Sequence, residues 1–333
     1  MYNMKKSLIF SGISLVALLL SGCNALPVPT GPTGPLSSST ITTSDQPSTG
    51  ESTSIAPTTA TSAPTTNPST SSSTTGTSST TGSTGTSTTS PIDPDNYYSS
   101  ISDDLTGDAL LNALRNLNKS KKKKEVGYKA MGTSAAGPFK YTDYDPATVK
   151  YDENGQPYGT AIVSFYSGNK MTSFNREHVW PNTHGGNKVE DDIHMPRPTI
   201  PSENGSRGHS FYIEGMKTKN DTGWDPAMED FGKEDYRGDS ARIIFYCMVA
   251  NNTLTLVDDP SLSKNTRNNQ MGVISDMLSW NLRYPVLARE QRRNSGAEYL
   301  QGNRNPFIDH PEYACRIWSG FNSKTQQICS AIH

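Results

Sequence analysis

Four of the six histidines of this 333-residue chain fall in one polar segment, residues 175–209. The segment reads NREHVWPNTHGGNKVEDDIHMPRPTIPSENGSRGH, and its histidines are His178, His184, His194 and His209. It is rich in Gly and Pro and offers few side chains that could build a core. Histidine, carboxylate and arginine side chains gathered in this way can move protons, hold a cation and bind an anion. We therefore expect the chemistry of the protein to lie in this segment.

Two kinds of metal chemistry could use these residues. Histidines and carboxylates together can ligate zinc, but no HExxH motif is present and the spacing of His178 and His184 is not a recurrent ligand spacing. Alternatively, the Glu177 carboxylate and the amide oxygen of Asn204 suit Mg²⁺, which prefers oxygen ligands and keeps several waters. His178 would then be free to act as a base, because the ordinary pKa of histidine is near neutral.

Three arginines of the segment, Arg176, Arg197 and Arg207, could hold a phosphate with two hydrogen bonds each. A base for water, a metal ion for the developing charge and a cation for the phosphate are together what phosphodiester hydrolysis requires.

One geometric condition must be met before Glu177 and His178 can serve a single site. Neighbouring residues on a continuous strand point to opposite faces of the sheet. The strand that carries these two residues must therefore end or bend at this point. Pro181, three residues later, favours such an ending.

Three motifs succeed one another in the segment: Asn175-Arg176-Glu177-His178-Val179-Trp180-Pro181, then Asp192-x-His194-x-x-x-Pro198, then Asn204-x-x-Arg207-Gly208. They resemble the core of the bacterial endonuclease I family, secreted or periplasmic nucleases with a ββα-metal (His-Me finger) site. Further motifs match in order: RGDSAR at 237–242, WN at 280–281, ExxRN at 290–294 and QGNRNPFIDHP at 301–311. The resemblance covers roughly residues 97–318.

By this resemblance, His178 is the general base that deprotonates the attacking water. Glu177 and Asn204 hold one divalent cation, Mg²⁺, for which Ca²⁺ or Mn²⁺ could substitute. Cleavage is expected to leave a 5′-phosphate. Arg207 and Arg176 are the two candidates for contact with the scissile phosphate.

The resemblance also places Asp192 and His194 on the second strand of the finger, where we expect structural roles. The Asn303-Arg304-Asn305 turn is expected to be a structural clasp rather than a substrate contact.

Hydrophobic spacing predicts a mixed α+β domain for residues 97–333, with the site between its elements. Helices are expected over Ala109–Leu117 and Gly272–Leu282, and a strand over Thr160–Tyr166. The apolar run Arg242–Ala250 could be a helix or a strand. Lys119–Lys124 holds five lysines in six residues, which indicates a solvated helix end or a nucleic-acid patch.

The N-terminal part of the chain is unlike the rest. Residues 1–22 have two lysines followed by a 13-residue apolar run, as in a secretory signal peptide, and the Leu20-Ser21-Gly22-Cys23 sequence resembles a bacterial lipoprotein signal in which Cys23 is lipidated. In the following segment, residues 37–90 include 37 Ser or Thr. Such a composition cannot bury enough apolar area to fold, so residues 23–96 are predicted to be a disordered tether.

Charge and cysteine content narrow the class of protein. Residues 97–333 contain 28 basic and 28 acidic side chains, which excludes a polycation that binds nucleic acid by bulk charge. Of the remaining cysteines, Cys315 and Cys329 could pair outside the cytoplasm, and Cys247 is expected to be a buried free thiol.

The sequence thus predicts an extracytoplasmic, metal-dependent, non-specific endonuclease. It is anchored to the membrane through Cys23, acts as a monomer, and cleaves DNA, RNA or both through contacts with the phosphate backbone. Two alternatives stay open: a catalytically weakened nucleic-acid-binding surface lipoprotein, and a zinc hydrolase built on the same histidines.

Overall fold

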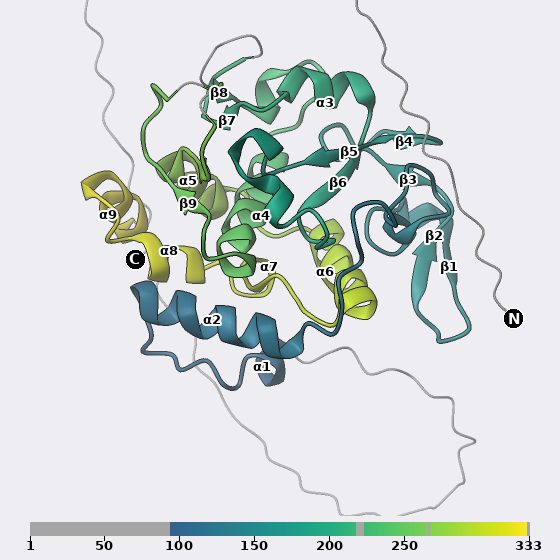
Figure 1. Ribbon diagram of the computed structural model, residues 1–333, viewed down its shortest axis with the longest axis horizontal. Coiled ribbons are helices and arrows are strands. Elements are labelled where there is room, and N and C mark those ends of the chain that lie inside the picture. Colours follow the sequence, from purple (N-terminus) through teal and green to yellow (C-terminus); the bar gives the residue numbers. More distant parts are fainter. Residues whose placement is uncertain (1–93, 218–222, 263, 266, 332–333) are drawn as a thin grey trace, which may run out of the picture. The chain divides into compact units, whose positions relative to one another are not determined.

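Helix α4 (Tyr236–Ala250) is buried along almost its whole length and lies at the centre of the computed structural model (Figure 1). The structure describes residues 94–217, 223–262, 264–265 and 267–331. Fourteen of the 15 residues of α4 are buried, and a helix that is apolar on most sides needs neighbours all round. The run Arg242–Ala250, which the sequence left open between helix and strand, is therefore part of a central helix.

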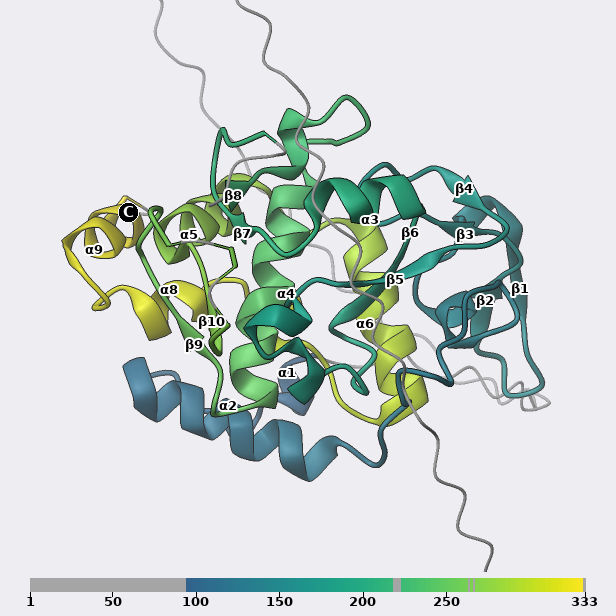
Figure 2. The ribbon, with the colours of Figure 1, turned by 45° about the horizontal axis from the view of Figure 1, so that its top comes forward.

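Further helices pack around α4 and complete the core. α2 (Gly107–Lys121), α5 (Ile274–Arg283) and α7 (Pro306–Asp309) contact it directly, and α8 lies against α2. Turning the molecule shows α2 crossing one end of α4 (Figure 2). The other helices of the described chain are α1 (Pro94–Tyr97), α3 (Pro201–Arg207), α6 (Ala288–Gln301), α8 (Tyr313–Trp318) and α9 (Ser323–Ser330). Short 3₁₀ turns are η1 (Pro138–Tyr141), η2 (Pro146–Thr148), η3 (Asn182–His184), η4 (Gly186–Lys188) and η5 (Pro226–Met228).

The strands are short and, in the described chain, form only two-stranded pairs. Three pairs are antiparallel: β1 (Val149–Tyr151) with β2 (Pro157–Gly159), β3 (Ile162–Val163) with β4 (Lys170–Met171), and β5 (Asn175–His178) with β6 (Pro196–Thr199). Two pairs are parallel: β7 (Phe211–Tyr212) with β8 (Gly223–Trp224), and β9 (Thr255–Leu256) with β10 (Gln270–Met271).

β5, β6 and α3 follow one another and carry the segment that the sequence singled out. β5 and β6 pair so that Glu177 lies opposite Arg197 and His178 opposite Pro196. Pro201, at the first turn of α3, starts the helix soon after β6 ends, because proline is tolerated where no intrahelical N–H partner exists. α3 then packs back against β5. The arrangement is a strand, an antiparallel strand and a helix in close succession.

Both predicted helices are confirmed, but the predicted strand is mostly wrong. Ala109–Leu117 lies within α2, and Gly272–Leu282 overlaps α5. Of Thr160–Tyr166, only Ile162–Val163 is a strand, and the chain then turns so that the Gly168 amide bonds to the Ser164 carbonyl. The apolar residues of this run are buried against other aromatic side chains rather than in a sheet, which the sequence pattern alone does not distinguish.

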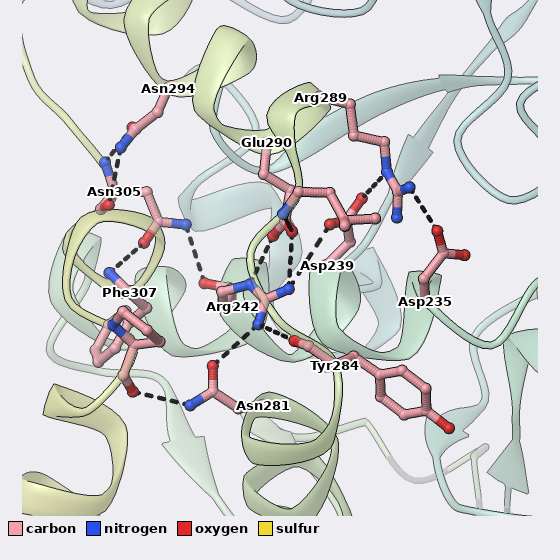
Figure 3. A network of polar contacts seen from close by, with 12 residues as sticks. Asp235, Asp239, Arg242, Asn281, Tyr284, Arg289, Glu290, Asn294, Asn305 and Phe307 are labelled. Atoms are coloured by element: carbon pink, nitrogen blue, oxygen red, sulfur yellow. Dashed lines mark hydrogen bonds and ion pairs between the residues drawn. The ribbon is translucent and has the colours of Figure 1, made fainter. Parts of the chain in front are cut away.

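The motifs outside the site meet in a buried ionic network, drawn in Figure 3. Arg242 of α4 forms two hydrogen bonds to Glu290 of α6, at 2.6 and 2.8 Å, and a third to the Tyr284 carbonyl at 3.0 Å. Asn305 donates to the Arg242 carbonyl at 3.0 Å and accepts from the amide of Phe307. These contacts tie α4, α6 and α7 together across 63 residues of sequence.

The cysteines behave as the composition suggested. Cys315 of α8 and Cys329 of α9 form a disulfide across 14 residues, and Cys247 is a buried free thiol. The predicted signal peptide (1–22), Cys23 and almost all of the predicted tether lie outside the described residues; α1 begins at Pro94, three residues before the predicted domain start. None of the described helices has the length and apolar character needed to cross a membrane.

Candidate active site

His178 is the last residue of β5, and its imidazole is held from two sides. Nε2 lies 3.0 Å from Oε2 of Glu190, and the ring packs against Tyr128 with 4.6 Å between centroids. Donation of Nε2–H to the carboxylate leaves Nδ1 as the proton acceptor, and Nδ1 has no hydrogen bond within the described part of the chain. Burial lowers the pKa of His178 below its ordinary value, although Glu190 opposes the change. The neutral, basic form is thereby favoured at neutral pH.

Glu177, the residue before His178 on β5, is buried. Its Oε1 accepts a hydrogen bond from the Tyr166 hydroxyl at 2.9 Å and lies 3.5 Å from Nη1 of Arg207. Burial raises the pKa of Glu177 to about 7, while Arg207 and Tyr166 act in the opposite direction. Oε2 makes no hydrogen bond to any described residue, so one carboxylate oxygen is left over.

Asn204 lies in the middle of α3, which packs against β5. Its side-chain amide is partly exposed and has no hydrogen bond within the described chain. An amide and a carboxylate oxygen without protein partners are the donor types that hard divalent cations take, with water completing the shell. The described residues hold no group of three or more His, Cys, Asp or Glu side chains placed to bind a metal.

The two candidate arginines occupy different environments. Arg176 is partly exposed: its guanidinium stacks on the Tyr128 ring at 3.9 Å and donates to the Tyr128 carbonyl at 2.7 Å. Arg207 is fully buried, and its Nη1 and Nη2 donate to the carbonyls of His178 and Val179 at 3.0 and 2.8 Å. Arg207 thus fixes the backbone at the end of β5, and Arg176 alone of the two reaches the surface.

Asp192 and His194, on the segment just before β6, lie in a buried polar cluster. Asp192 accepts from Lys122 at 2.7 Å and from the Tyr246 hydroxyl at 2.6 Å. Burial would raise the pKa of Asp192, but Lys122 and the hydrogen bonds hold it at about 2. Nε2 of His194 lies 3.0 Å from the Asn303 carbonyl, and burial lowers the pKa of His194 to about 4.

The Asn303-Arg304-Asn305 turn is buried, and its side chains bond other parts of the domain. Asn303 donates to the hydroxyl of Tyr246 at 2.7 Å, and Arg304 forms two hydrogen bonds to Asp309 at 2.6 and 2.7 Å.

The structure brings His178, Glu177, Asn204 and Arg176 to one strand–strand–helix unit, and adds three residues that sequence reasoning missed. Glu190 and Tyr128 contact His178, and Tyr166 contacts Glu177. Glu190 stands in the His-rich segment beside Asp191 and Asp192, but no spacing rule distinguishes it from its acidic neighbours. Tyr128 and Tyr166 lie outside that segment, and their roles follow from packing alone.

Comparison with known proteins shows which family the chain resembles. Residues 106–312 match the family model described as Endonuclease I. An extracellular ribonuclease of Bacillus amyloliquefaciens is 31% identical over 251 residues, which cover 69% of this chain and 80% of the relative. An extracellular ribonuclease of Bacillus subtilis (strain 168) is 31% identical over 250 residues, 68% of this chain and 79% of the relative.

The chain belongs to the endonuclease I family. It is therefore a nuclease, a hydrolase whose substrate is nucleic acid. The match includes β5, β6 and α3 and all the residues assigned to the site, and it confirms the predicted single α+β domain with that family's fold. Within this endonuclease I domain, the helices of the core hold together elements that are each too short to be stable alone.

Proposed function

We propose that the protein is a divalent-metal-dependent, non-specific endonuclease in which His178 is the general base and β5, β6 and α3 form a ββα-metal unit. The observation that carries the proposal is the state of the His178 ring. One ring nitrogen is 3.0 Å from the Glu190 carboxylate, and the other has no hydrogen bond to a described residue. A base needs this combination of a fixed orientation and a free acceptor.

Each residue of the chain has a definite task in this proposal. Nδ1 of His178 takes a proton from the attacking water, and Glu190 stabilises the imidazolium that results. Arg207 holds the end of β5 in place through the His178 and Val179 carbonyls, so we assign it a positioning role. Arg176 is the surface arginine next to His178 and is our choice for contact with the scissile phosphate.

Glu177 and Asn204 would hold the cation, and their unpaired oxygens support this assignment. A bound Mg²⁺, or Ca²⁺ or Mn²⁺ in its place, would stabilise negative charge on the phosphate and the leaving oxygen. The Tyr166 hydroxyl, 2.9 Å from Oε1, fixes the carboxylate so that Oε2 keeps one direction. Because β5 ends at His178, we place the scissile phosphate just beyond this end of the β5–β6 pair, between the side chains of Glu177 and His178.

The two relatives support a proposal for the substrate and the location. Both are named extracellular ribonucleases, so we propose that RNA is a substrate of this chain, with DNA as a second substrate because the site contacts a backbone that both share. The products are proposed to carry 5′-phosphates. We further propose that the enzyme works outside the cytoplasm as a monomer on a membrane anchor at Cys23, with residues 24–93, up to the start of α1, as a tether.

The test is an assay of the purified protein on RNA, single-stranded DNA and plasmid DNA, with Mg²⁺, Ca²⁺, Mn²⁺ or EDTA. We expect activity with a divalent ion and none with EDTA. His178→Ala should lower the rate by about 10²–10⁴-fold, the usual contribution of a general base.

Asn204→Ala should lower activity and raise the Mg²⁺ concentration needed for half-maximal rate. His209→Ala is the matched control for His178→Ala, since His209 lies in the same histidine-rich segment and bonds Asn265 rather than a residue of the site. Equal, EDTA-insensitive activity of wild type and His178→Ala would overturn the mechanism. Zinc retained after mutation of Asn204 would favour a zinc hydrolase.

A further inference from the structure

The end of α2 carries a local excess of positive charge in a domain whose basic and acidic residues are equal in number. Of the five lysines in Lys119–Lys124, Lys122 is paired with Asp192 and Glu125, at 2.7 and 2.6 Å. The other four, Lys119, Lys121, Lys123 and Lys124, are exposed, and no ion pair holds them in the part of the chain that the structure describes. Exposed lysines without acidic partners keep their full attraction for an anion.

One loop joins these lysines to the proposed catalytic base. Three successive residues of the loop make the connection: Glu190 to His178, Asp191 to the amide of Tyr128, and Asp192 to Lys122, at 3.0, 2.7 and 2.7 Å. Two residues of chain span at most about 7 Å, so one short loop contacts both the proposed base and Lys122 of the lysine run. Figure 1 shows the chain leaving α2 and rising past α6 toward the strands.

A hollow beside the lysines offers room for a bound strand. Its volume is about 580 Å³, and it lies between α2 and the end of α4. Arg115, Lys119 and Lys122 supply its cations, and Glu125, already paired with Lys122, is its one acidic lining residue. The remaining polar lining is amide: Asn112, Asn116, Asn118, Asn251 and Asn252. Cationic and amide donors together bind phosphate oxygens without reading a base sequence.

We propose that Lys119, Lys123, Lys124 and the hollow lined by Arg115 form an accessory site for the phosphate backbone of nucleic acid. This site would bind phosphates of the substrate other than the one that is cleaved. The proposal rests on the proposed nuclease function and adds the surface that holds a long substrate. We prefer nucleic acid to an anionic lipid surface because the loop at residues 190–192 ties the lysines to His178.

The first measurement is binding without cleavage, with full-length protein in EDTA and a fluorescent 30-nucleotide RNA. Lys119→Gln/Lys123→Gln/Lys124→Gln should weaken binding at least tenfold at low salt. If all three lysines contact phosphates, the slope of log K against log salt should become shallower by about 2, at ~0.7 per contact on a single strand. Unchanged affinity, or no RNA binding by the wild type, would overturn the accessory site.

A control matched in net charge neutralises three exposed lysines elsewhere, Lys217→Gln/Lys233→Gln/Lys324→Gln, of which Lys217 and Lys324 are ion-paired with Asp230 and Asp276. It should bind RNA within twofold of wild type. An equal loss in both variants would mean that net charge, not this surface, holds the RNA. Loss of binding to phosphatidylglycerol vesicles with RNA binding intact would assign the lysines to a membrane instead.

Cleavage separates this proposal from the catalytic one. With Mg²⁺, the triple variant at 119, 123 and 124 should show a raised KM on long RNA and an unchanged rate on a tetranucleotide too short to reach the lysines. Lysine-dependent binding by a protein that cleaves nothing would leave the accessory site standing and overturn the proposed function. If the protein cleaves RNA and neither its KM nor its RNA binding depends on these lysines, the proposed function stands and the accessory site is overturned.

Discussion

The reactivity of His178 is set by the few side chains that touch it. Tyr128 packs on the ring, Glu190 fixes one nitrogen, and burial keeps the pKa of the ring below its ordinary value. Arg176 reaches the same Tyr128 ring from two residues away on β5, so one aromatic side chain supports both the base and the surface arginine. A change at Tyr128 or Glu190 should therefore act through His178.

The contact between Glu190 and the His178 ring leads to a direct prediction for Glu190. Glu190→Gln keeps the shape and an acceptor for Nε2–H but removes the charge that stabilises the imidazolium. We expect kcat to fall about 10- to 100-fold, less than for loss of the base itself, with KM little changed.

Steady-state kinetics on RNA separate the two constants. Asp191→Asn is the matched control, since the neighbouring carboxylate contacts the Tyr128 amide rather than the ring of His178, and its kcat should stay within about threefold of wild type. A raised KM at constant kcat in Glu190→Gln would instead assign Glu190 to substrate binding.

Asp192 gives a prediction for stability against pH. Its pKa is held at about 2 in the folded protein, below the ~3.9 of an unfolded aspartate. The unfolded state therefore binds the proton first, and the stabilisation is full above about pH 4 and lost as the pH falls toward 2. The two-unit shift corresponds to roughly 2–3 kcal/mol of unfolding free energy.

Urea unfolding at pH 6 and at pH 2.5 measures this contribution. Asp192→Asn should have a lower free energy of unfolding than wild type at pH 6, and this difference should shrink by most of that amount at pH 2.5. A deficit that is the same at both values would show that the pKa of Asp192 is not depressed in the folded state.

At the scale of elements, the site depends on units too short to be stable alone. β5 and β6 have four residues each and α3 has seven. Their positions are fixed by side-chain hydrogen bonds. Arg207 of α3 bonds the backbone at the end of β5, and Tyr166 bonds Glu177 of β5. Farther away, the Arg242 network of Figure 3 fixes α4, α6 and α7 as one frame.

Removing Arg242 should therefore destabilise the whole domain. Arg242→Ala leaves the Glu290 carboxylate buried with no cation beside it, a loss that typically costs 3–5 kcal/mol. Arg283→Ala is the control, since Arg283 forms an exposed pair with Glu214, and we expect a change below about 1 kcal/mol. Chemical denaturation measures the free energy of unfolding of both variants. Similar losses of unfolding free energy in the two would contradict a special role for the network.

At the scale of the whole molecule, the described domain has the enzyme chemistry, and we propose that the N-terminal segment directs the protein to the membrane. A single acyl chain gives only marginal membrane binding, whereas a lipoprotein cysteine carries more than one. The proposed anchor would hold the nuclease outside the cytoplasm while the tether lets it reach substrate.

Cys23→Ser tests the anchor in full-length protein made in a bacterium. Wild type should partition into the detergent phase of a Triton X-114 extraction, and the variant should move to the aqueous phase or the medium. Cys247→Ser, which changes the buried thiol, should partition like wild type. Detergent partitioning of the Cys23 variant would mean that another part of the chain binds the membrane.

Local signals in the sequence were enough for much of this protein. Leucines at helical spacing specified α2, because one face of that helix has to be buried whatever its partner. The types and order of Glu177, His178 and Asn204 indicated a base and an oxygen-ligand site, since those chemical properties belong to the residues themselves. The charge balance of residues 97–333 likewise showed that phosphate affinity had to be local.

Only the tertiary structure decided which residues meet. The run Thr160–Tyr166 looked like a strand, but its aromatic side chains pack on residues that come later in the chain, Phe165 on Tyr236 of α4 and Tyr166 on Trp224 of β8. Arg207 and Arg176 were equivalent in sequence, and packing buries one and exposes the other. Glu190 lies 12 residues from His178 and Tyr128 lies 50 residues away, and no local pattern encodes such contacts, because they depend on how separate elements close around a shared core.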